Sequence, residues 1–483
     1  MYFQAVRARG RCLGHHHCGR ATENARPLDE GPSRPALCSA LRRSRILAIL
    51  PLSRDIRRSR DSAPMQPPPP AKPSLRILAV SPVYWPCVGG GERLLGTILE
   101  QLVARGHEAT VLTVDAARHP DMFRSKGAGL PQCDIHAGVH IRRFSPGGGF
   151  FGRAAGWLNG KPGVHNVLQS LSGGRSELIT ARPNPREFVW PLATARADVI
   201  IAANWWSAIP VLAAFIARSR RIPVVALPLL HIIRPWANRP VLSRALPLCT
   251  CTVGLTPSEA EHHRRLGARR ATVIGGAIAP DWGQAADGAP LRRRLGLGTE
   301  PVIAFVGRQD EFKGAPTLVN AMRLVWRQRP DAVLLLAGQA AHRDDATRTA
   351  LAALASDDRR RVVEVNDFSD AEAADVFAAC DILAQPSIEE SFGLVLIEAW
   401  MAGRPVIGAS IPATCDMIAD GDDGLIVPPG NPPALADAIL RLVTAPAMRA
   451  QMGERGRAKV RARFTTPTMV DAWEELLMEA GRR

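Results

Sequence analysis

The feature that most constrains the fold of this sequence is a repeated order of short apolar runs and amphipathic segments, which begins near Leu75. Residues 75–82 (LRILAVSP) fit a buried strand, and residues 93–108 then place leucine and isoleucine at helical spacing. Further apolar runs follow at residues 109–114, 197–203, 222–230 and 249–256. Strands that alternate with helices predict a parallel sheet covered by helices on both faces.

A second series of the same kind begins near Pro301. Its expected helices cover residues 316–328 and 370–380, and its expected strands cover residues 301–307, 332–339, 361–365, 381–387, 405–409 and 424–429. The predicted fold class is therefore α/β, with two doubly wound, Rossmann-like domains that face each other across a cleft.

These two series predict four parts of the chain. The parts are a disordered, basic and Pro-rich extension (1–74), an N-terminal Rossmann-like domain (75–280), a C-terminal Rossmann-like domain (290–465) and a terminal helix (466–483). Met65 is an alternative start, which leaves open whether residues 1–64 belong to the natural protein.

The composition fits a globular protein, with 46% apolar and 22% charged residues among 483. The net charge of +16 is uneven, because residues 1–74 alone contribute +9. A basic body suits a phosphate-bearing ligand or an anionic membrane surface. Nine cysteines without framework spacing indicate reduced thiols and a cytoplasmic protein, with peripheral association at the inner face of the membrane left open.

An uncharged stretch at residues 199–217 is long enough to span a bilayer as a helix. Asn204, Ser207 and Pro210 interrupt it, however, and Asp198 precedes it directly. A buried strand, a turn and a helix explain these interruptions better, so this is the structure that we expect.

Two loops that follow expected strands carry unusual residues. Gly89, Gly90 and Gly91 open the first helix, where free backbone N–H groups suit an anion. In the second loop, Arg308 and Lys313 lie five positions apart and suit a diphosphate, because arginine grips two oxygens while lysine supplies a point charge. Ordinary solvated charge is the alternative for the second loop.

The third loop, at residues 387–406, places Glu390 before a Phe392-Gly393 pair and Glu398 after it. Its apolar density predicts a buried helix at residues 392–402 with Ser391 as the N-cap, and Gly403 marks its end. Glu390 is then expected on the entering loop and Glu398 about two turns further along. The alternative is a capped helix with two surface carboxylates.

Together the three segments resemble the retaining glycosyltransferases of family 4, which have the GT-B fold. The family pattern is Gly-Gly-x-Glu near the N-terminus, then Gly-Arg-x4-Lys-Gly, then Glu-x-Phe-Gly followed by a helical Glu. Residues 89–92, 307–314 and 390–398 match it in order, and the resemblance runs from about Leu75 to the C-terminus.

The resemblance implies an enzyme that moves a hexose from a UDP- or GDP-linked sugar to an acceptor hydroxyl, and this donor is a substrate rather than a cofactor. It also implies that residues 75–280 form the acceptor-side domain and residues 290–465 the nucleotide-sugar donor domain. Arg308 and Lys313 would hold the diphosphate, and Glu398 would accept hydrogen bonds from the ribose. Glu390 would bind the hexose near the reacting centre, and His231, after an expected strand, would touch the sugar. The remaining donor-binding positions are Gly90, Gly91, Phe392, Gly393, Leu394 and Val395.

No metal is expected, because Asp420 and Asp422 sit in a turn-like DGDDG and the two cations of the second loop replace a divalent ion. Departures from the family pattern, at residues 274–280 and at Asn366-Asp367, leave recognition of the base less defined. Residues 138–185 are expected to shape the site of a glycan or lipid-linked acceptor of the cell envelope. The sugar, the nucleotide, the linkage and the oligomeric state are not specified.

Two other functions stay open on the sequence. One is a nucleotide-sugar 2-epimerase on the same fold, which would need no acceptor. The other is a non-enzymatic basic protein that binds nucleic acid or anionic lipid through its tail. Loss of residues 1–64 would leave the turnover of a transferase unchanged but weaken a tail-driven binder. The transferase interpretation expects no nucleic-acid partner.

Overall fold

The computed structural model describes residues 74–87, 89–123, 127–146, 185–338, 345–366 and 368–482. The predicted extension therefore lies almost wholly outside the described residues. Most of the segment expected to shape the acceptor site, from residue 147 to residue 184, also lies outside them.

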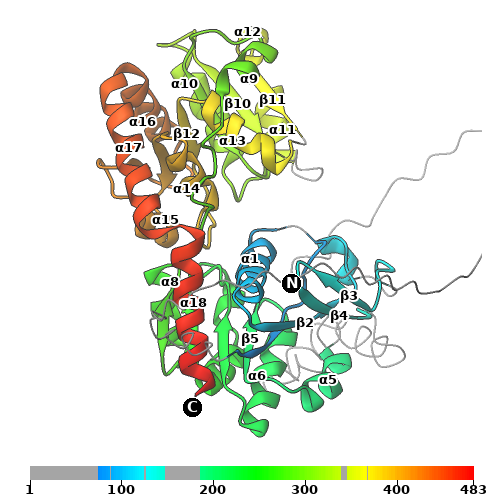
Figure 1. Ribbon diagram of the computed structural model, residues 1–483. Helices are drawn as coiled ribbons and strands as arrows, with labels where there is room; N and C mark the ends of the chain where they lie inside the picture. Colours follow the sequence, from blue (N-terminus) through cyan, green and yellow to red (C-terminus); the bar gives the residue numbers. More distant parts are fainter. Residues whose placement is uncertain are drawn as a thin grey trace, which may run out of the picture. The chain divides into compact units, whose positions relative to one another are not determined.

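Among the described residues, the first sheet contains eight strands in the order β3-β4-β2-β1-β5-β6-β7-β8. Figure 1 shows β2, β3 and β4 side by side in this sheet. All neighbours run parallel except β3, which pairs antiparallel with β4. Every residue of β5, β6 and β7 is buried, as expected for parallel strands covered on both faces. The strands are β1 (Arg76–Val80), β2 (Glu108–Val114), β3 (Cys133–His136), β4 (Val139–Phe144), β5 (Val199–Ala203), β6 (Val224–Leu227), β7 (Cys251–Gly254) and β8 (Ala271–Val273).

Among the helices of this half, α1 forms where the sequence places apolar residues three and four apart. In this helix, the buried leucines and isoleucines are those that the spacing predicted. The helical elements are α1 (Gly90–Ala104), η1 (His119–Phe123), η2 (Pro185–Phe188), α5 (Val189–Thr194), α6 (Ala208–Arg220), η3 (Pro235–Asn238), α7 (Pro240–Ala245), η4 (Leu246–Leu248) and α8 (Pro257–Arg265).

The uncharged stretch at residues 199–217 forms β5, a turn and most of α6, which confirms the expected strand, turn and helix. Ser207 caps α6, and its side-chain oxygen accepts a hydrogen bond from the N–H of Ile209 at 3.2 Å. Within the described part of the chain, no helix combines the length and the apolar character needed to cross a bilayer.

The second sheet contains six parallel strands in the order β11-β10-β9-β12-β13-β14. Its strands are β9 (Val302–Val306), β10 (Val333–Ala337), β11 (Val362–Val365), β12 (Ile382–Gln385), β13 (Val406–Ala409) and β14 (Gly424–Val427). The helices that follow α8 along the chain are α9 (Gly288–Arg294), α10 (Ala315–Val325), α11 (Asp345–Ala352), α12 (Ser356–Arg359), α13 (Asp370–Ala379), α14 (Leu394–Met401), α15 (Pro412–Met417), α16 (Pro432–Thr444), α17 (Pro446–Arg463) and α18 (Thr466–Gly481). The two sheets confirm the predicted fold class of two Rossmann-like domains, whereas the predicted domain boundaries stay a prediction.

Helix α14 begins later than expected. The prediction of a helix at residues 392–402 with Ser391 as N-cap was wrong, because Gly393 is the N-cap, with φ of +89°. A left-handed residue at this position suits glycine, which has no Cβ to clash. Gly403, with φ of +73°, ends the helix as expected, and its N–H donates to the carbonyl of Trp400 at 2.8 Å.

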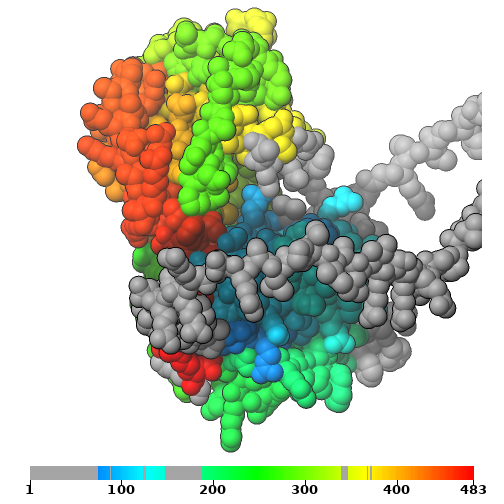
Figure 2. Space-filling view, in the orientation of Figure 1, coloured from blue at the N-terminus to red at the C-terminus, as the bar shows by residue number. Residues whose placement is uncertain are grey.

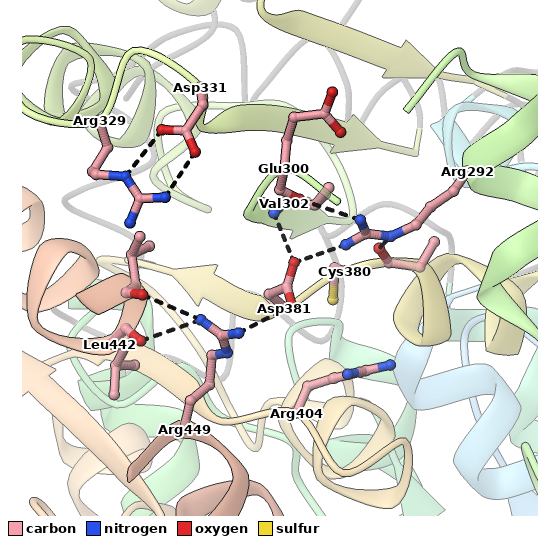
Figure 3. A network of polar contacts seen from close by, with 12 residues as sticks. Arg292, Glu300, Val302, Arg329, Asp331, Cys380, Asp381, Arg404, Leu442 and Arg449 are labelled. Atoms are coloured by element: carbon pink, nitrogen blue, oxygen red, sulfur yellow. Dashed lines mark hydrogen bonds and ion pairs between the residues drawn. The ribbon is translucent and has the colours of Figure 1, made fainter. Parts of the chain in front are cut away.

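Asp381, just before β12, is the centre of a polar network that ties several elements together (Figure 3). Its Oδ2 accepts hydrogen bonds from Nη2 of Arg292 at 2.7 Å and from the N–H of Val302 at 2.9 Å. Its Oδ1 lies 3.5 Å from Nη2 of Arg449, on α17. One carboxylate thereby holds α9, the start of β9 and α17, and the network lies at the end of the sheet where the strands begin.

The last two helices differ in how they are covered. Helix α17 lies along the surface (Figure 2), and the residues that it buries are Met452, Gly453, Gly456 and Val460. It packs on α14, whereas α18 packs on α1, β5 and β6 of the first sheet. The terminal helix thus adds its apolar face, including the fully buried Trp473, to the first half of the fold.

Candidate functional site

Each sheet has a switch point, where the strands that come earlier in the chain lie on one side and those that come later lie on the other. In the second sheet this point lies between β9 and β12, because β10 and β11 extend one side and β13 and β14 the other. In the first sheet it lies between β1 and β5. Open α/β sheets bind ligands beyond the carboxyl ends of the strands at such switch points, and the predicted site residues follow β1, β6, β9 and β12.

The loops after β9 and β12 touch each other through their backbones. The N–H of Ile388 donates to the carbonyl of Phe312 at 2.9 Å. Gly314 has φ of +83°, and a Cβ there would clash with the carbonyl oxygen of Pro386. Only glycine fits this close approach, so the Lys-Gly pair of the motif serves the geometry of the loop as well as its charge.

Lys313 and Glu390 form an ion pair across these two loops. The Lys313 Nζ lies 2.6 Å from Oε2 of Glu390, and the side chains are 22% and 15% exposed. Burial raises the pKa of Glu390, but the charge and hydrogen bond of Lys313, together with His231 and the N–H of Ser391, outweigh burial and hold that pKa below its ordinary value. Glu390 is therefore an ionised carboxylate at neutral pH.

Arg308 lies on the same loop in a different environment. Its side chain is 64% exposed, and Nη2 lies 3.3 Å from Oδ2 of Asp310. Asp310 also accepts the backbone N–H of Lys313 at 2.8 Å. The two predicted phosphate-binding cations thus have separate carboxylate partners, and Arg308 is the one that extends towards solvent.

The turn into α14 presents its backbone rather than its aromatic side chain. The ring of Phe392 is buried, because Gly275 and Gly276 leave room for it and Phe464 packs edge-on at 5.6 Å between ring centroids. Any ligand contact of Phe392 must therefore come from its main chain. Gly393, Leu394 and Val395 follow at the helix start, where N–H groups lack helical partners.

Glu398 lies in the middle of α14, is half-buried and has a polar partner. Its position on the helix agrees with the expected spacing from Glu390. The structure does not bring these two glutamates into a direct contact that defines a role for either, so their division of labour stays a prediction.

The glycine loop after β1 packs closely on the loops after β5 and β6. A Cβ on Gly91 would lie 2.8 Å from Oδ1 of Asn204 and 2.8 Å from the side chain of Leu229. A Cβ on Gly90 would lie 3.9 Å from the side chain of Leu394, at the start of α14. The glycines therefore let the start of α1 approach its neighbours.

His231 lies on the loop after β6, which a buried carboxylate holds in place. Oε1 of Glu259 accepts the N–H of Leu230 at 2.7 Å, and Oε2 accepts the N–H of Leu255 at 2.8 Å. Burial lowers the pKa of His231 below its ordinary value, although Glu389 and Glu390 act in the opposite direction. The imidazole is therefore neutral at neutral pH.

Two residues that the sequence analysis missed connect the His231 loop to the loops after β9 and β12. Nε of Arg234 donates to Oε2 of Glu389 at 2.7 Å, and the guanidinium also stacks on the ring of Phe312 at 4.3 Å from its centroid. Nδ1 of His231 lies 3.1 Å from Oε1 of Glu389. Arg234 and Glu389 are 155 positions apart, so no local spacing could have linked them.

The DGDDG segment is a turn whose carboxylates already have protein partners. Oδ1 of Asp420 accepts the N–H of Ile426 at 2.9 Å, Asp422 pairs with Arg455, and Asp423 pairs with Lys459. In the described ranges, no group of three or more His, Cys, Asp or Glu side chains is arranged to hold a metal ion.

A cavity of about 280 Å³ lies away from these loops. Its lining is mostly apolar and includes Leu255, Ile274, Met417, Phe464 and Met469. None of the predicted site residues lines it, and the chemistry of the switch-point loops is the better guide to function.

Two family models match the chain. A glycosyl transferase 4-like domain matches residues 89–276, and the glycosyl transferases group 1 domain matches residues 289–459. Between them the two models cover every strand of the second sheet, the strands of the first sheet other than β1, and more than half of the chain.

Curated relatives match one part of the chain. The D-inositol 3-phosphate glycosyltransferase of Corynebacterium glutamicum (strain R) is 36% identical over 169 residues, which are 34% of this chain and 40% of that protein. The alpha-D-kanosaminyltransferase of Streptomyces kanamyceticus is 28% identical over 194 residues, which are 40% of this chain and 49% of that protein. Each match thus spans less than half of the relative.

The fold as a whole is similar to that of the Anabaena protein Alr3699/HepE, solved in complex with UDP and glucose and also with UDP-glucose. The complex with UDP and glucose superposes with a TM-score of 0.63 at 22% identity and covers 84% of this chain and 100% of that one. With both family models matched and the whole fold shared, the chain belongs to the family 4 glycosyltransferases, which have the GT-B fold.

Proposed function

We propose that this protein is a retaining glycosyltransferase that moves a hexose from a UDP- or GDP-linked sugar to an acceptor hydroxyl. The observation that carries the proposal is the ion pair between Lys313 and Glu390, 2.6 Å apart at the switch point of the second sheet. It places a cation for a diphosphate beside a carboxylate for sugar hydroxyls, on loops that follow adjacent strands.

The donor diphosphate lies against Lys313, Arg308 and the amides at the start of α14. The exposed Arg308 is available to wrap a phosphate, and the backbone N–H groups of Leu394 and Val395 suit its oxygens. Glu398 binds the ribose, and the glycines at the start of α1 admit the sugar. The complexes of Alr3699/HepE with UDP and with UDP-glucose support a donor of this class.

Transfer breaks the bond between the anomeric carbon and the leaving phosphate oxygen and forms a bond from that carbon to the acceptor oxygen. Negative charge grows on the departing diphosphate, where preorganised cations and amides stabilise it. The leaving phosphate takes the acceptor proton on the same face of the sugar, which retains the anomeric configuration. Glu390 orients the hexose and strengthens its contacts as the ring becomes oxocarbenium-like.

Metal independence is part of the proposal. Arg308 and Lys313 supply the positive charge that a divalent ion supplies in metal-dependent transferases, and the carboxylates of the DGDDG turn have protein partners. The proposed acceptor is a glycan or glycolipid of the cell envelope, reached by a cytoplasmic protein at the inner face of an anionic membrane. The name of the D-inositol 3-phosphate glycosyltransferase of Corynebacterium glutamicum (strain R) supports the choice of a hydroxyl acceptor.

Mass spectrometry of reaction products tests the proposal. The protein is incubated with a panel of UDP- and GDP-linked hexoses, a panel of glycan and glycolipid acceptors, and excess EDTA. The expected result is release of the nucleoside diphosphate together with an acceptor that has gained one hexosyl residue. Isomerisation of the donor sugar without an acceptor would instead identify an epimerase, and strict dependence on added divalent ion would overturn the metal-independent mechanism.

A further inference from the structure

The loops after β6, β9 and β12 carry the proposed chemistry, and they are connected through a carboxylate that lies outside the three motifs. Glu389 precedes Glu390 on the loop after β12, and its side chain is 13% exposed. It receives Arg234 at Oε2 and faces His231 at Oε1. Each oxygen of this carboxylate therefore addresses a different residue of the loop that follows β6.

Arg234 makes this contact rigid in two ways. Its guanidinium donates to Glu389 through Nε at 2.7 Å and through a second nitrogen. It also lies over the ring of Phe312, which belongs to the loop that carries Lys313. A planar guanidinium can bind a carboxylate and stack on an aromatic ring at the same time, which an ammonium cannot do equally well.

One ring nitrogen of His231, Nδ1, faces the carboxylate of Glu389. Glu259 fixes the backbone just before His231, and Leu229, with φ of +55°, turns the chain there. In the described part of the chain, Nδ1 has no aligned hydrogen-bond partner, and Oε1 of Glu389 lies 3.1 Å from it. A small rotation of either group aligns the pair for a hydrogen bond.

We propose that Glu389, anchored by Arg234, is the positioning residue that selects the tautomer of His231. An ionised carboxylate facing Nδ1 favours the tautomer that carries its proton on Nδ1, because only that form can donate to it. Nε2 then keeps its lone pair and accepts a hydrogen bond from a hydroxyl of the donor sugar. This inference rests on the proposed function, in which His231 touches the sugar.

Several charged groups surround the imidazole and set the direction of its response to pH. Glu389, Glu390 and Glu259 raise the pKa of His231, whereas Lys313 lowers it, and burial outweighs them all. Arg234, adjacent to Glu389, also acts against a positive imidazole. Removing the charge of Glu389 therefore lowers the pKa of His231 further and moves its protonation to lower pH.

The test is a cycle of Glu389→Gln and His231→Ala, measured with the donor that gives turnover. Glu389→Gln is expected to lower kcat about tenfold, the scale of ~1.4 kcal/mol in barrier, with donor KM within about twofold. The acid limb of its kcat/KM profile should move to lower pH, which a loss of packing alone would not cause. In the His231→Ala background, the same substitution should change kcat less than about twofold, because the group that Glu389 positions is gone.

A matched control is Glu454→Gln, which removes a carboxylate from the exposed pair with Arg457, outside the site. It should leave kcat and the pH profile unchanged. Glu389→Gln could lower the unfolding temperature by leaving Arg234 without its partner. In that case the variant Arg234→Met/Glu389→Gln, which removes both charges, replaces Glu389→Gln in the cycle with His231→Ala.

The inference would be overturned if Glu389→Gln lowered kcat equally in the wild-type and His231→Ala backgrounds and left the acid limb of the kcat/KM profile in place. Sugar transfer by the wild-type protein would still support the proposed function in that case. A wild-type protein that transfers no sugar from any donor of the panel would overturn the proposed function and the inference with it.

Discussion

Nζ of Lys313 lies 2.6 Å from Oε2 of Glu390, and this pair joins the loops that leave two adjacent strands, β9 and β12. The strands put the loops side by side at the switch point, and the glycine at position 314 lets their backbones touch. The ammonium keeps the carboxylate ionised despite its burial. The motif residues are therefore one electrostatic unit, although 77 positions separate them.

The pair should make a pH-dependent contribution to stability. The pKa of Glu390 is lower in the folded protein than in the unfolded chain. The stabilising contribution is therefore fully present above the unfolded pKa, about 4.3, and it is lost as the pH falls through the folded pKa. Lys313→Met should lower the free energy of unfolding by about 1–3 kcal/mol at neutral pH, and this difference should shrink below about pH 4. Denaturation with urea across pH would measure it.

Two controls accompany that measurement. Lys313→Met/Glu390→Gln removes both charges and should recover part of the loss, because no buried carboxylate is left unpaired. Glu454→Gln removes the charge of the exposed partner of Arg457 and should cost less than about 1 kcal/mol. A loss in Lys313→Met that did not change with pH would show that the pair contributes by packing rather than by charge.

The two glutamates of the motif should affect different kinetic constants. Glu398→Gln should raise donor KM several-fold with little change in kcat, because ribose contacts are similar in the ground and transition states. Glu390→Gln should lower kcat at least about tenfold, because its sugar contacts strengthen as positive charge develops. Steady-state kinetics with varied donor and saturating acceptor separate these results. The reverse pattern would mean that the two roles are exchanged.

The glycine of the Lys-Gly pair should be required for its shape. Gly314 and Gly296 both have positive φ, +83° and +67°, but a Cβ at Gly296 would meet nothing within 4 Å. Gly296→Ala should therefore cost only the backbone strain, about 1–2 kcal/mol. Gly314→Ala adds the clash with Pro386 and should be more destabilising and less active. Equal unfolding midpoints for the two variants would contradict the close approach of the loops.

Asp381 should matter more to stability than a surface carboxylate in the same view (Figure 3). Asp381→Asn leaves Arg292 and the N–H of Val302 poorly paired and should lower the free energy of unfolding by about 1–3 kcal/mol. Asp331→Asn is the matched control, since it breaks an exposed pair with Arg329 and should cost less than about 1 kcal/mol. Chemical denaturation of both variants compares them, and equal losses would refute the central role of Asp381.

The sequence predicted the parts of this protein that depend on local pattern. Alternating apolar runs and helical spacing located both sheets, and post-strand position located the loops that hold Lys313, Glu390 and His231. The start of α14 was wrong because serine resembles a cap in sequence, whereas the left-handed turn uses Gly393. The short β3 and β8 strands gave too few residues for a period to show. Strand β4 was also missed, although its six residues alternate between buried and less buried positions.

Contacts between distant segments could not be predicted in this way. Arg234, Glu259 and Glu389 have no spacing that relates them to His231, since folding alone brings them to it. The buried ring of Phe392 is a similar case, because Gly275 and Gly276 make its space from more than a hundred positions away. A pattern reports which residues follow a strand, but pairing across loops is a property of the folded chain.

The most direct test of the donor site is a calorimetric titration of the protein with UDP and with GDP in the presence of EDTA. One of these nucleotides is expected to bind the wild-type protein at a single site. Lys313→Met should weaken the affinity for that nucleotide at least about tenfold, the scale of a lost charge-assisted contact. Arg329→Ala, which breaks an exposed ion pair, should leave the affinity unchanged. Absence of binding by either nucleotide, or equal affinities in the wild-type protein and Lys313→Met, would contradict the proposed donor site.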